Sequence, residues 1–404
     1  MHEIYCLETE SASLSFSGGE LKTKEFDSSN GYGVRVLEKK RIGFAYCQKE
    51  EDIEKAKADA TRMSRFSVES SMSFAPPADY RKMDMVDPSL DIQDSAALRS
   101  FLDEAREGAE SKGGHARVML DASRMKVKLE NDVGLHGEYD KTGFSVYAEC
   151  MHDDGFGMAY VASHKAQPVR EIGLRAAQMA SDMRGAKKPE SGTYTVVMEP
   201  DALMSVLDTL IPSFSGDWKR RGITKLAPGE KRFSDNFTLC EDGLAPASDA
   251  RPFDDEGTPS RKRYLVRDGV VESFLYDRET AALAGVDESG ACSRDGYDRP
   301  PTIHTSNIVI GPGTWNDLNE LDKHIELHYA HGSHTANPTS GDIGLEASAA
   351  FLVTKGERKP LKGFMLSGNI FEMFTDIEGI EKKQQTNGSL IAPRIAFRNL
   401  RVVS

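Results

Sequence analysis

Hydrophobic and polar residues alternate along the first part of the chain, which is the period of a β-strand. Between residues 3 and 46 this alternation predicts a β-meander, with turns at Gly18-Gly19 and at Gly31-Tyr32-Gly33. From Glu50 to Phe66 the apolar residues instead recur at helical spacing. We therefore predict a first α+β domain, residues 1–66, in which strands are followed by a packing helix.

The pattern then repeats after an aperiodic stretch. Residues 67–93 lose the periodicity and contain proline turns, so we interpret them as a linker. Residues 94–188 begin with a helix for which Asp94 is the expected N-cap. Two short segments of the first domain return here, each before a helix: Glu25-Phe26-Asp27 as Glu138-Tyr139-Asp140, and Gly43-Phe44-Ala45-Tyr46 as Gly157-Met158-Ala159-Tyr160. We predict a central α+β domain that repeats the first.

The turn-forming residues 185–192 mark the boundary to a C-terminal domain, residues 189–404, in which strand signals prevail. A strand is expected near residues 194–198, then a helix that ends at Pro212. Another helix is expected from Leu318 to Ile325. The predicted fold class is therefore α+β, with a repeated strand-and-helix N-terminal region followed by a β-rich C-terminal domain.

An acidic stretch, Pro252-Phe253-Asp254-Asp255-Glu256-Gly257-Thr258-Pro259, precedes a strand and a hairpin turn at Arg267-Asp268-Gly269. We expect a returning strand over residues 270–276 and a helix over residues 277–285, with an acid at its start and glycine at its end. The three consecutive acids have the chemistry to bind a cation or to cap backbone N–H groups. A solvated turn is the favoured interpretation, because Asp and Gly populate turns for conformational reasons alone.

Charge and cysteine content argue against several classes of protein, among them nucleic-acid-binding proteins and disulfide-rich secreted proteins. A formal net charge of −13 over 404 residues argues against a nucleic-acid surface. The basic run Lys219-Arg220-Arg221 is interpreted as an exposed helix end. We expect no membrane segment and no secretory signal. Five widely spaced cysteines without a CxxC pair fit a cytoplasmic protein without a disulfide framework.

Candidate chemistry is sparse. His324, Glu326, His328, His331 and His334 lie within eleven residues, and three of these histidines have the donors for a zinc site. Ile325 stands where HExxH needs its Glu, so surface or turn histidines are the favoured interpretation. Cys292 has a basic neighbour, but no oriented base is evident for a nucleophilic cysteine.

Several segments together resemble the TldD/PmbA family, whose members are also known as modulators of DNA gyrase and as the TldD/TldE peptidase. Their order and spacing carry the resemblance, which spans nearly the whole chain. The segments are Gly33-Val34-Arg35-Val36, Gly43-Phe44-Ala45-Tyr46, Gly216-Asp217-Trp218, Phe253-Asp254-Asp255-Glu256-Gly257, Asp268-Gly269-Val270, Asn307, Pro312-Gly313 and Thr339-Ser340-Gly341-Asp342.

The resemblance implies a cytoplasmic two-subunit assembly in which a TldD-type chain is a zinc peptidase that cleaves unfolded peptides in an enclosed cavity. That chain carries HExxxH before the Gly-Asp-aromatic segment and a Cys ligand near its C-terminus. Here the positions are Leu207, Asp208 and Pro212, and no Cys follows Cys292. Leu and Pro donate no lone pair to zinc, so we expect no catalytic residue, cofactor or metal in this chain.

Three hypotheses follow. The first is a non-catalytic TldE/PmbA-like subunit that forms a heterodimer with a TldD-type zinc peptidase and helps to degrade unfolded peptides. The second is a self-sufficient, homodimeric metallopeptidase that uses the histidines from His324 to His334. The third is a regulatory binding protein that acts on a DNA enzyme, although the acidic charge disfavours direct contact with DNA.

Overall fold

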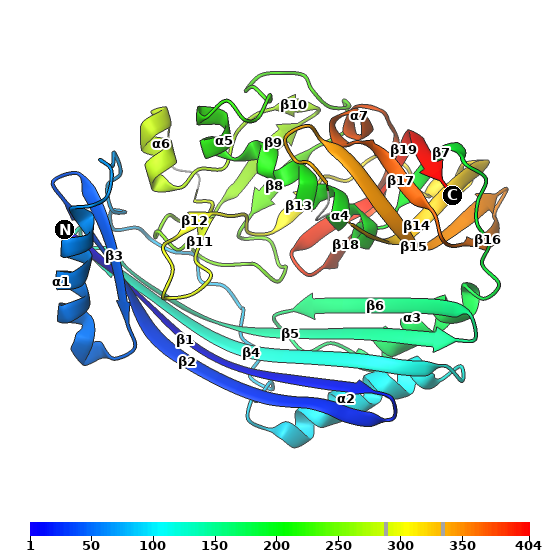
Figure 1. Cartoon of the computed structure of the whole chain (residues 1–404), viewed down its shortest axis with the longest axis horizontal. Coiled ribbons are helices and arrows are strands. Elements are labelled where there is room, and N and C mark those ends of the chain that lie inside the picture. Colours follow the sequence, from blue (N-terminus) through cyan, green and yellow to red (C-terminus); the bar gives the residue numbers. More distant parts are fainter. Residues whose placement is uncertain (287–289, 333–335) are drawn as a thin grey trace.

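The chain folds into a long curved sheet and a β-rich C-terminal part that lies over one face of that sheet (Figure 1). The computed structural model describes residues 1–286, 290–332 and 336–404. Both helices and strands are present in each part, so the predicted α+β class is confirmed.

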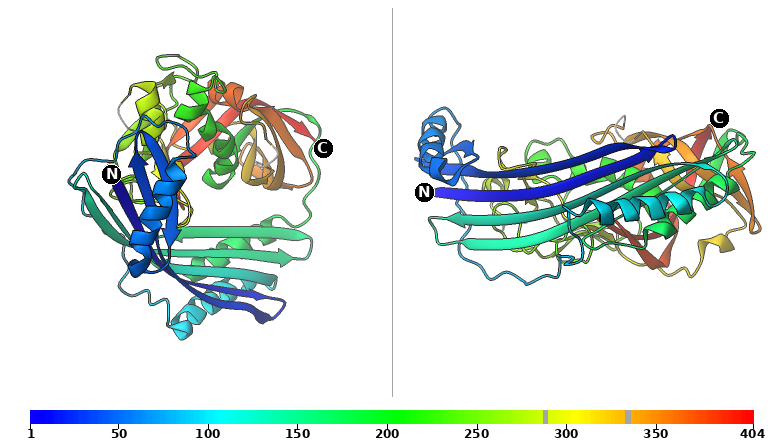
Figure 2. Two further views of the ribbon diagram at one scale, coloured as in Figure 1. Left: turned by 60° about the vertical axis from the view of Figure 1, so that its left-hand side comes forward. Right: turned by 90° about the horizontal axis from the view of Figure 1, so that it is seen from below.

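The N-terminal sheet has six strands in the order β3-β2-β1-β4-β5-β6, and all neighbours are antiparallel. Its long strands run along the length of the molecule (Figure 2). The strands are β1 His2–Ser17, β2 Glu20–Glu38, β3 Arg41–Cys47, β4 His115–Asn131, β5 His136–His152 and β6 Gly155–Ser163. The accompanying helices are η1 Glu50–Asp52, α1 Ile53–Ser64, α2 Ser95–Glu110 and α3 Val169–Asp182.

Helices α2 and α3 pack against one face of the sheet, its outer face, and bury the apolar side chains there. Leu14 of β1 and Val118 of β4 share a core with Leu98 and Leu102 of α2 and with apolar residues of α3. The predicted N-cap of α2 is present, because the Asp94 carboxylate accepts hydrogen bonds from the amides of Ala96 and Ala97. The opposite face is left to meet the C-terminal part.

The two halves of this sheet have the same local topology. Each consists of three antiparallel strands followed by a helix, β1-β2-β3-α1 in one half and β4-β5-β6-α3 in the other. Strand β1 pairs with β4, so strands from residues 1–66 and from residues 94–188 belong to one continuous sheet.

The turn predicted at Gly31-Tyr32-Gly33 is wrong. Strand β2 continues through these residues, and the chain reverses at Lys39 and Lys40 instead. The glycines serve close packing: a Cβ on Gly31 would lie 2.3 Å from Cε2 of Tyr297, which belongs to a loop of the C-terminal part. Glycine is therefore needed here for space rather than for a turn.

The C-terminal part contains an eleven-stranded sheet. Strand β7 pairs with both β14 and β19, so that the strands β19, β17, β15, β14 and β7 close into a barrel. The strands are β7 Gly192–Met198, β8 Leu239–Asp242, β9 Lys262–Arg267, β10 Val270–Val271, β13 Ile308–Ile310, β14 Lys323–His331, β15 Asp342–Thr354, β16 Glu357–Leu361, β17 Met365–Asn369, β18 Ile377–Asn387 and β19 Leu390–Val403. A small separate sheet pairs β11 Cys292–Ser293 with β12 Thr302–Ile303.

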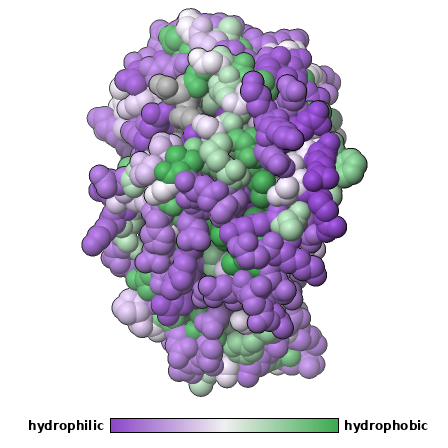
Figure 3. All heavy atoms as spheres, turned by 90° about the vertical axis from the view of Figure 1, so that its left-hand side faces the viewer, coloured by the Kyte–Doolittle hydropathy of each residue, from purple (hydrophilic) through white to green (hydrophobic). Residues whose placement is uncertain are grey.

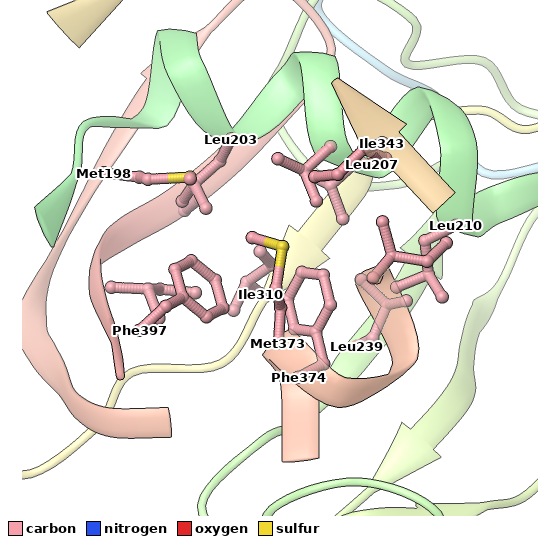
Figure 4. Close-up of a cluster of buried hydrophobic side chains, with 14 of the residues drawn as sticks. Met198, Leu203, Leu207, Leu210, Leu239, Ile310, Ile343, Met373, Phe374 and Phe397 are labelled. Atoms are coloured by element: carbon pink, nitrogen blue, oxygen red, sulfur yellow. The ribbon is translucent and has the colours of Figure 1, made fainter. Parts of the chain in front are cut away.

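Helix α4 packs its apolar stripe into the main core of this part. The labelled side chains of Leu203, Leu207 and Leu210 meet those of Ile310 and Phe374 there (Figure 4). The helices and 3-10 turns of the C-terminal part are α4 Pro200–Leu210, η2 Ile211–Phe214, α5 Gly216–Arg220, α6 Arg278–Ala284, η3 Leu318–Glu320 and α7 Ile370–Thr375.

Of two local predictions after the hairpin turn, the helix is confirmed and the strand is only partly formed. Helix α6 forms as expected: the Asp277 side chain accepts from the amide of Thr280, and Gly285 is left-handed with φ of 64°. The returning strand expected over residues 270–276 is limited to the two residues of β10.

The helix expected from Leu318 to Ile325 is wrong. Only the 3-10 turn η3 forms, and β14 begins at Lys323. The apolar residues Ile325 and Leu327 are two apart and enter the barrel core, which is the period of a strand.

The surface is largely hydrophilic. Seen from the end of the molecule at the left of Figure 1, hydrophobic residues form small groups among polar ones (Figure 3). Among the described residues, no helix has both the length and the apolar character that a membrane crossing requires.

Candidate functional site

Helix α4 and the following turn η2 carry the three positions at which the family resemblance places HExxxH. Leu207 is 1% exposed and its side chain lies in the barrel core beside Ile343 (Figure 4). Asp208 is exposed on the next position of the helix, and Pro212 lies in η2. Of these three side chains only Asp208 has an oxygen or nitrogen donor, so the set does not fit a zinc ion.

These positions border a cavity of about 420 Å³ that we call the α4 cavity. Its wall is mainly apolar and includes Met204, Ile211, Trp218, Leu275 and Ile303. A cavity lined in this way suits an apolar group rather than a metal-bound water.

The acidic stretch is buried, so the favoured interpretation of a solvated turn is wrong. Asp254, Asp255 and Glu256 are all buried where the C-terminal part meets the N-terminal sheet. Oδ1 of Asp254 accepts the amides of Glu256 at 3.1 Å and Thr258 at 2.8 Å, and thereby caps the turn. Burial, with the nearby Glu256 carboxylate, raises the pKa of Asp254 to about 8.

Glu256 is part of a buried ion network that joins the two parts of the molecule. Arg35 of β2 forms a bidentate pair with Glu3 of β1, at 2.8 Å from Nε and 2.9 Å from Nη2, and its Nη1 lies 2.6 Å from Glu256. Nη2 of Arg294 lies 2.7 Å from Glu3. The Arg35 and Arg294 guanidiniums outweigh burial and lower the pKa of Glu3, so the carboxylate is charged.

The histidine cluster is spread along strand β14. His324, Glu326 and His328 alternate with the core residues Ile325 and Leu327, and His324 is fully buried. Nε2 of His328 lies 2.6 Å from Oε1 of Glu326. His331 is exposed at the end of the strand, and His334 lies outside the described residues. Because β14 is extended, it spaces out along the strand the histidines that lie close together in the sequence.

Two groups of side chains among the described residues have ligand atoms within 4.8 Å of one another. In the first, Glu199, Glu326 and His328, the Glu326 carboxylate is already 2.9 Å from Nη2 of Arg358, and Nη1 of Arg394 lies 3.5 Å from Glu199. A cation there would compete with two guanidiniums, which argues against a metal.

The second group, Asp254, Glu256 and Cys292, is wholly buried. Glu256 is engaged by Arg35, and burial raises the pKa of the Cys292 thiol well above its usual value. A protonated thiol is neither a good metal ligand nor a good nucleophile. This group therefore does not support a role of Cys292 as a catalytic nucleophile.

The basic run at the end of α5 has local partners. Arg220 lies 2.8 Å and Arg221 3.3 Å from the carboxylate of Asp217. This is an exposed helix end with internal ion pairs, as expected from the sequence.

A second cavity, of about 540 Å³, lies between the inner face of the N-terminal sheet and the loops of the C-terminal part. We call it the arginine cavity, because Arg251 and Arg294 line it together with Tyr139 and Lys141 of β5. Sequence reasoning missed these residues. Arg251 stands directly before the acidic stretch, but nothing in the spacing links it to Lys141.

Comparisons with known proteins agree with the resemblance. The PmbA/TldA metallopeptidase C-terminal domain matches residues 191–404, and the PmbA/TldA metallopeptidase domain 1 matches residues 2–64.

Full-length relatives are also found. An uncharacterized protein of Methanocaldococcus jannaschii is 29% identical and shares 98% of this chain and 95% of its own length. A metalloprotease of Methanothermobacter thermautotrophicus is 24% identical over 91% of this chain and 85% of its own. The crystal structure of TldE from Thermococcus kodakarensis has a TM-score of 0.92 at 24% identity, covering 100% of this chain and 96% of that one, which establishes a shared fold. By the domain matches at both ends, this chain belongs to the PmbA/TldD family of metallopeptidase-like proteins.

Proposed function

We propose that this chain is a non-catalytic, TldE-like subunit that pairs with a separate TldD-type zinc metallopeptidase and helps to hold the unfolded peptides which that partner cleaves. The observation that carries the proposal is the side-chain set on α4 and η2. Leu207 lies in the core and Pro212 has no donor, so no zinc-bound water is activated at these positions.

The two cavities support a role in peptide binding. The α4 cavity borders the positions at which a catalytic family member is expected to carry its zinc ligands, and the arginine cavity adjoins it. Zinc is expected in the partner and not here. The five free cysteines support the cytoplasmic location that the proposal includes.

The test is reconstitution with an HExxxH-containing family member from the same organism. We expect a one-to-one complex in size-exclusion chromatography with light scattering, and faster hydrolysis of an unfolded peptide by the pair than by the partner alone. A pair in which the partner's HExxxH glutamate is replaced by glutamine is the control and is expected to be inactive. Equal activity with and without this chain would refute the proposal.

A second candidate, a self-sufficient metallopeptidase, rests on Glu199, Glu326 and His328. It predicts peptide hydrolysis by this chain alone that is lost in His328→Ala and Glu199→Gln. Our proposal predicts no peptide hydrolysis by the wild-type chain alone, and therefore no difference between the wild type and these two variants.

A further inference from the structure

The α4 cavity and the arginine cavity adjoin each other. Asp249, His304 and Thr305 line both of them, so a ligand that passes these residues reaches from one cavity into the other. The cavities differ in chemistry, because the wall of the α4 cavity is mainly apolar, whereas the arginine cavity is lined by charged side chains of both signs, among them three cations.

Arg251 is the most unusual of these cations. Its residue is only 7% exposed, yet Nε and Nη2 of its guanidinium have no hydrogen-bond partner among the described residues. Buried guanidinium nitrogens are nearly always paired, because an unpaired one forfeits its hydration without return. Nη1 of Arg294, at the same cavity, also has no partner among the residues described.

Lys141 adds a third positive charge. It forms no ion pair of 4.0 Å or less within the described parts of the chain, and of the charges near it the carboxylate of Asp249 acts more strongly than the guanidinium of Arg251. Four carboxylates also line the cavity: Asp249, Asp255, Asp295 and Asp298. Of these, Asp255 accepts the backbone amide of Arg294 at 2.7 Å and is also the carboxylate whose charge acts most strongly on Arg251, although it makes no hydrogen bond to Nε or Nη2 of that guanidinium.

The α4 cavity complements this charged site. Ile211, Pro212, Leu275 and Ile303 give it a wall that suits an aliphatic or aromatic side chain. A peptide end offers both kinds of group, since a carboxylate and an apolar side chain are close neighbours along an extended chain.

We propose that the arginine cavity binds a peptide carboxylate through Arg251, assisted by Lys141, while a neighbouring apolar side chain of the same peptide occupies the α4 cavity. The carboxylate is the free C-terminus or an Asp or Glu side chain. This inference rests on the proposed function, because it names the kind of peptide that the subunit holds.

The test is fluorescence polarisation with the purified chain alone and three labelled peptides of one apolar-rich sequence. The first has a free C-terminal carboxylate, the second a C-terminal amide, and the third an amide with one glutamate near its end. We expect the first or the third to bind at least about tenfold more tightly than the second, and which of the two does so identifies the source of the carboxylate. Equal binding of all three, or no binding, would overturn the proposal.

Variants assign the effect to Arg251. Arg251→Gln is expected to abolish the preference for the carboxylate and Arg251→Lys to keep part of it, whereas Arg220→Gln on the exposed α5 surface is the matched control and keeps all of it. Circular dichroism and thermal unfolding establish that each variant is folded. The wild-type comparison of the three peptides decides the proposal even where a variant does not fold. An unchanged preference in folded Arg251→Gln would contradict it.

The outcome is separable from that of the reconstitution experiment. Carboxylate-selective binding without any gain in the partner's activity would reject only the proposed function. A gain in activity without carboxylate selectivity would reject only the inference about Arg251.

Discussion

At the scale of single residues, the three consecutive acids of the buried turn have three different partners. Asp254 caps backbone amides, Asp255 accepts the amide of Arg294, and Glu256 pairs with Arg35. The sequence showed that the acids were adjacent, but their burial depends on Glu3, Arg35 and Arg294, which come from distant segments. A turn of Asp and Gly is solvated by default, and only the tertiary partners make it a buried site.

The raised pKa of Asp254 predicts a pH dependence of stability. The folded protein keeps this proton up to about pH 8, whereas the unfolded chain releases it near the ordinary value of 3.8. The folded state therefore binds more protons between these values, and the free energy of unfolding falls as the pH rises, by at most about 1.4 kcal/mol per pH unit.

Asp254→Asn removes this titration while its side-chain oxygen still accepts the amides of Glu256 and Thr258. Urea unfolding at several pH values from about 5 to about 9 measures the effect. We expect the free energy of unfolding to fall less steeply with pH in the variant than in the wild type. Parallel slopes would contradict the assignment.

At the scale of elements, patterns that depend on local sequence were predicted well and patterns that depend on packing were not. Helices α2 and α6 have Asp94 and Asp277 as their N-caps, as expected, because an N-cap is a local hydrogen bond. The helix expected from Leu318 to Ile325 was wrong, because residues 323–325 belong to strand β14, in which His324 and Glu326 are buried. Their burial is set by neighbouring strands, which the sequence does not place.

Strand β2 provides the element-scale prediction. A methyl group on Gly31 would overlap the ring of Tyr297, so Gly31→Ala is expected to destabilise the protein by about 1–3 kcal/mol in chemical denaturation. In a Tyr297→Ala background the same substitution is expected to cost much less, which a double-mutant cycle measures. Ser28→Ala on the same strand is the control. An equal cost in both backgrounds would show that the glycine is needed for another reason.

At the scale of the whole molecule, the N-terminal sheet and the C-terminal part are joined by buried charges. Glu3 and Arg35 come from the sheet, and Glu256 and Arg294 from the loops above it. The same approach of the two parts brings Lys141 next to Arg251 and forms the arginine cavity. The family resemblance therefore indicated candidate positions on α4 and η2, whereas the cavity residues come from several distant segments and could not be predicted from the sequence.

Arg35→Met tests this junction. Removing the guanidinium leaves Glu3 and Glu256 buried with fewer partners, so we expect a loss of about 3–5 kcal/mol in the free energy of unfolding. Arg124→Met is the matched control, because the Arg124 pair with Asp140 is exposed and contributes at most about 1 kcal/mol. Similar losses in both variants would argue that the buried network does not hold the two parts together.

The most direct test of the central claim, that this chain has no hydrolytic metal of its own, is its zinc content. The protein is purified alone, dialysed against zinc and then against metal-free buffer, and measured by inductively coupled plasma mass spectrometry. We predict far less than one zinc per chain, unchanged in His328→Ala. About one tightly held zinc per chain, lost in His328→Ala, would contradict the account and favour a self-sufficient metallopeptidase.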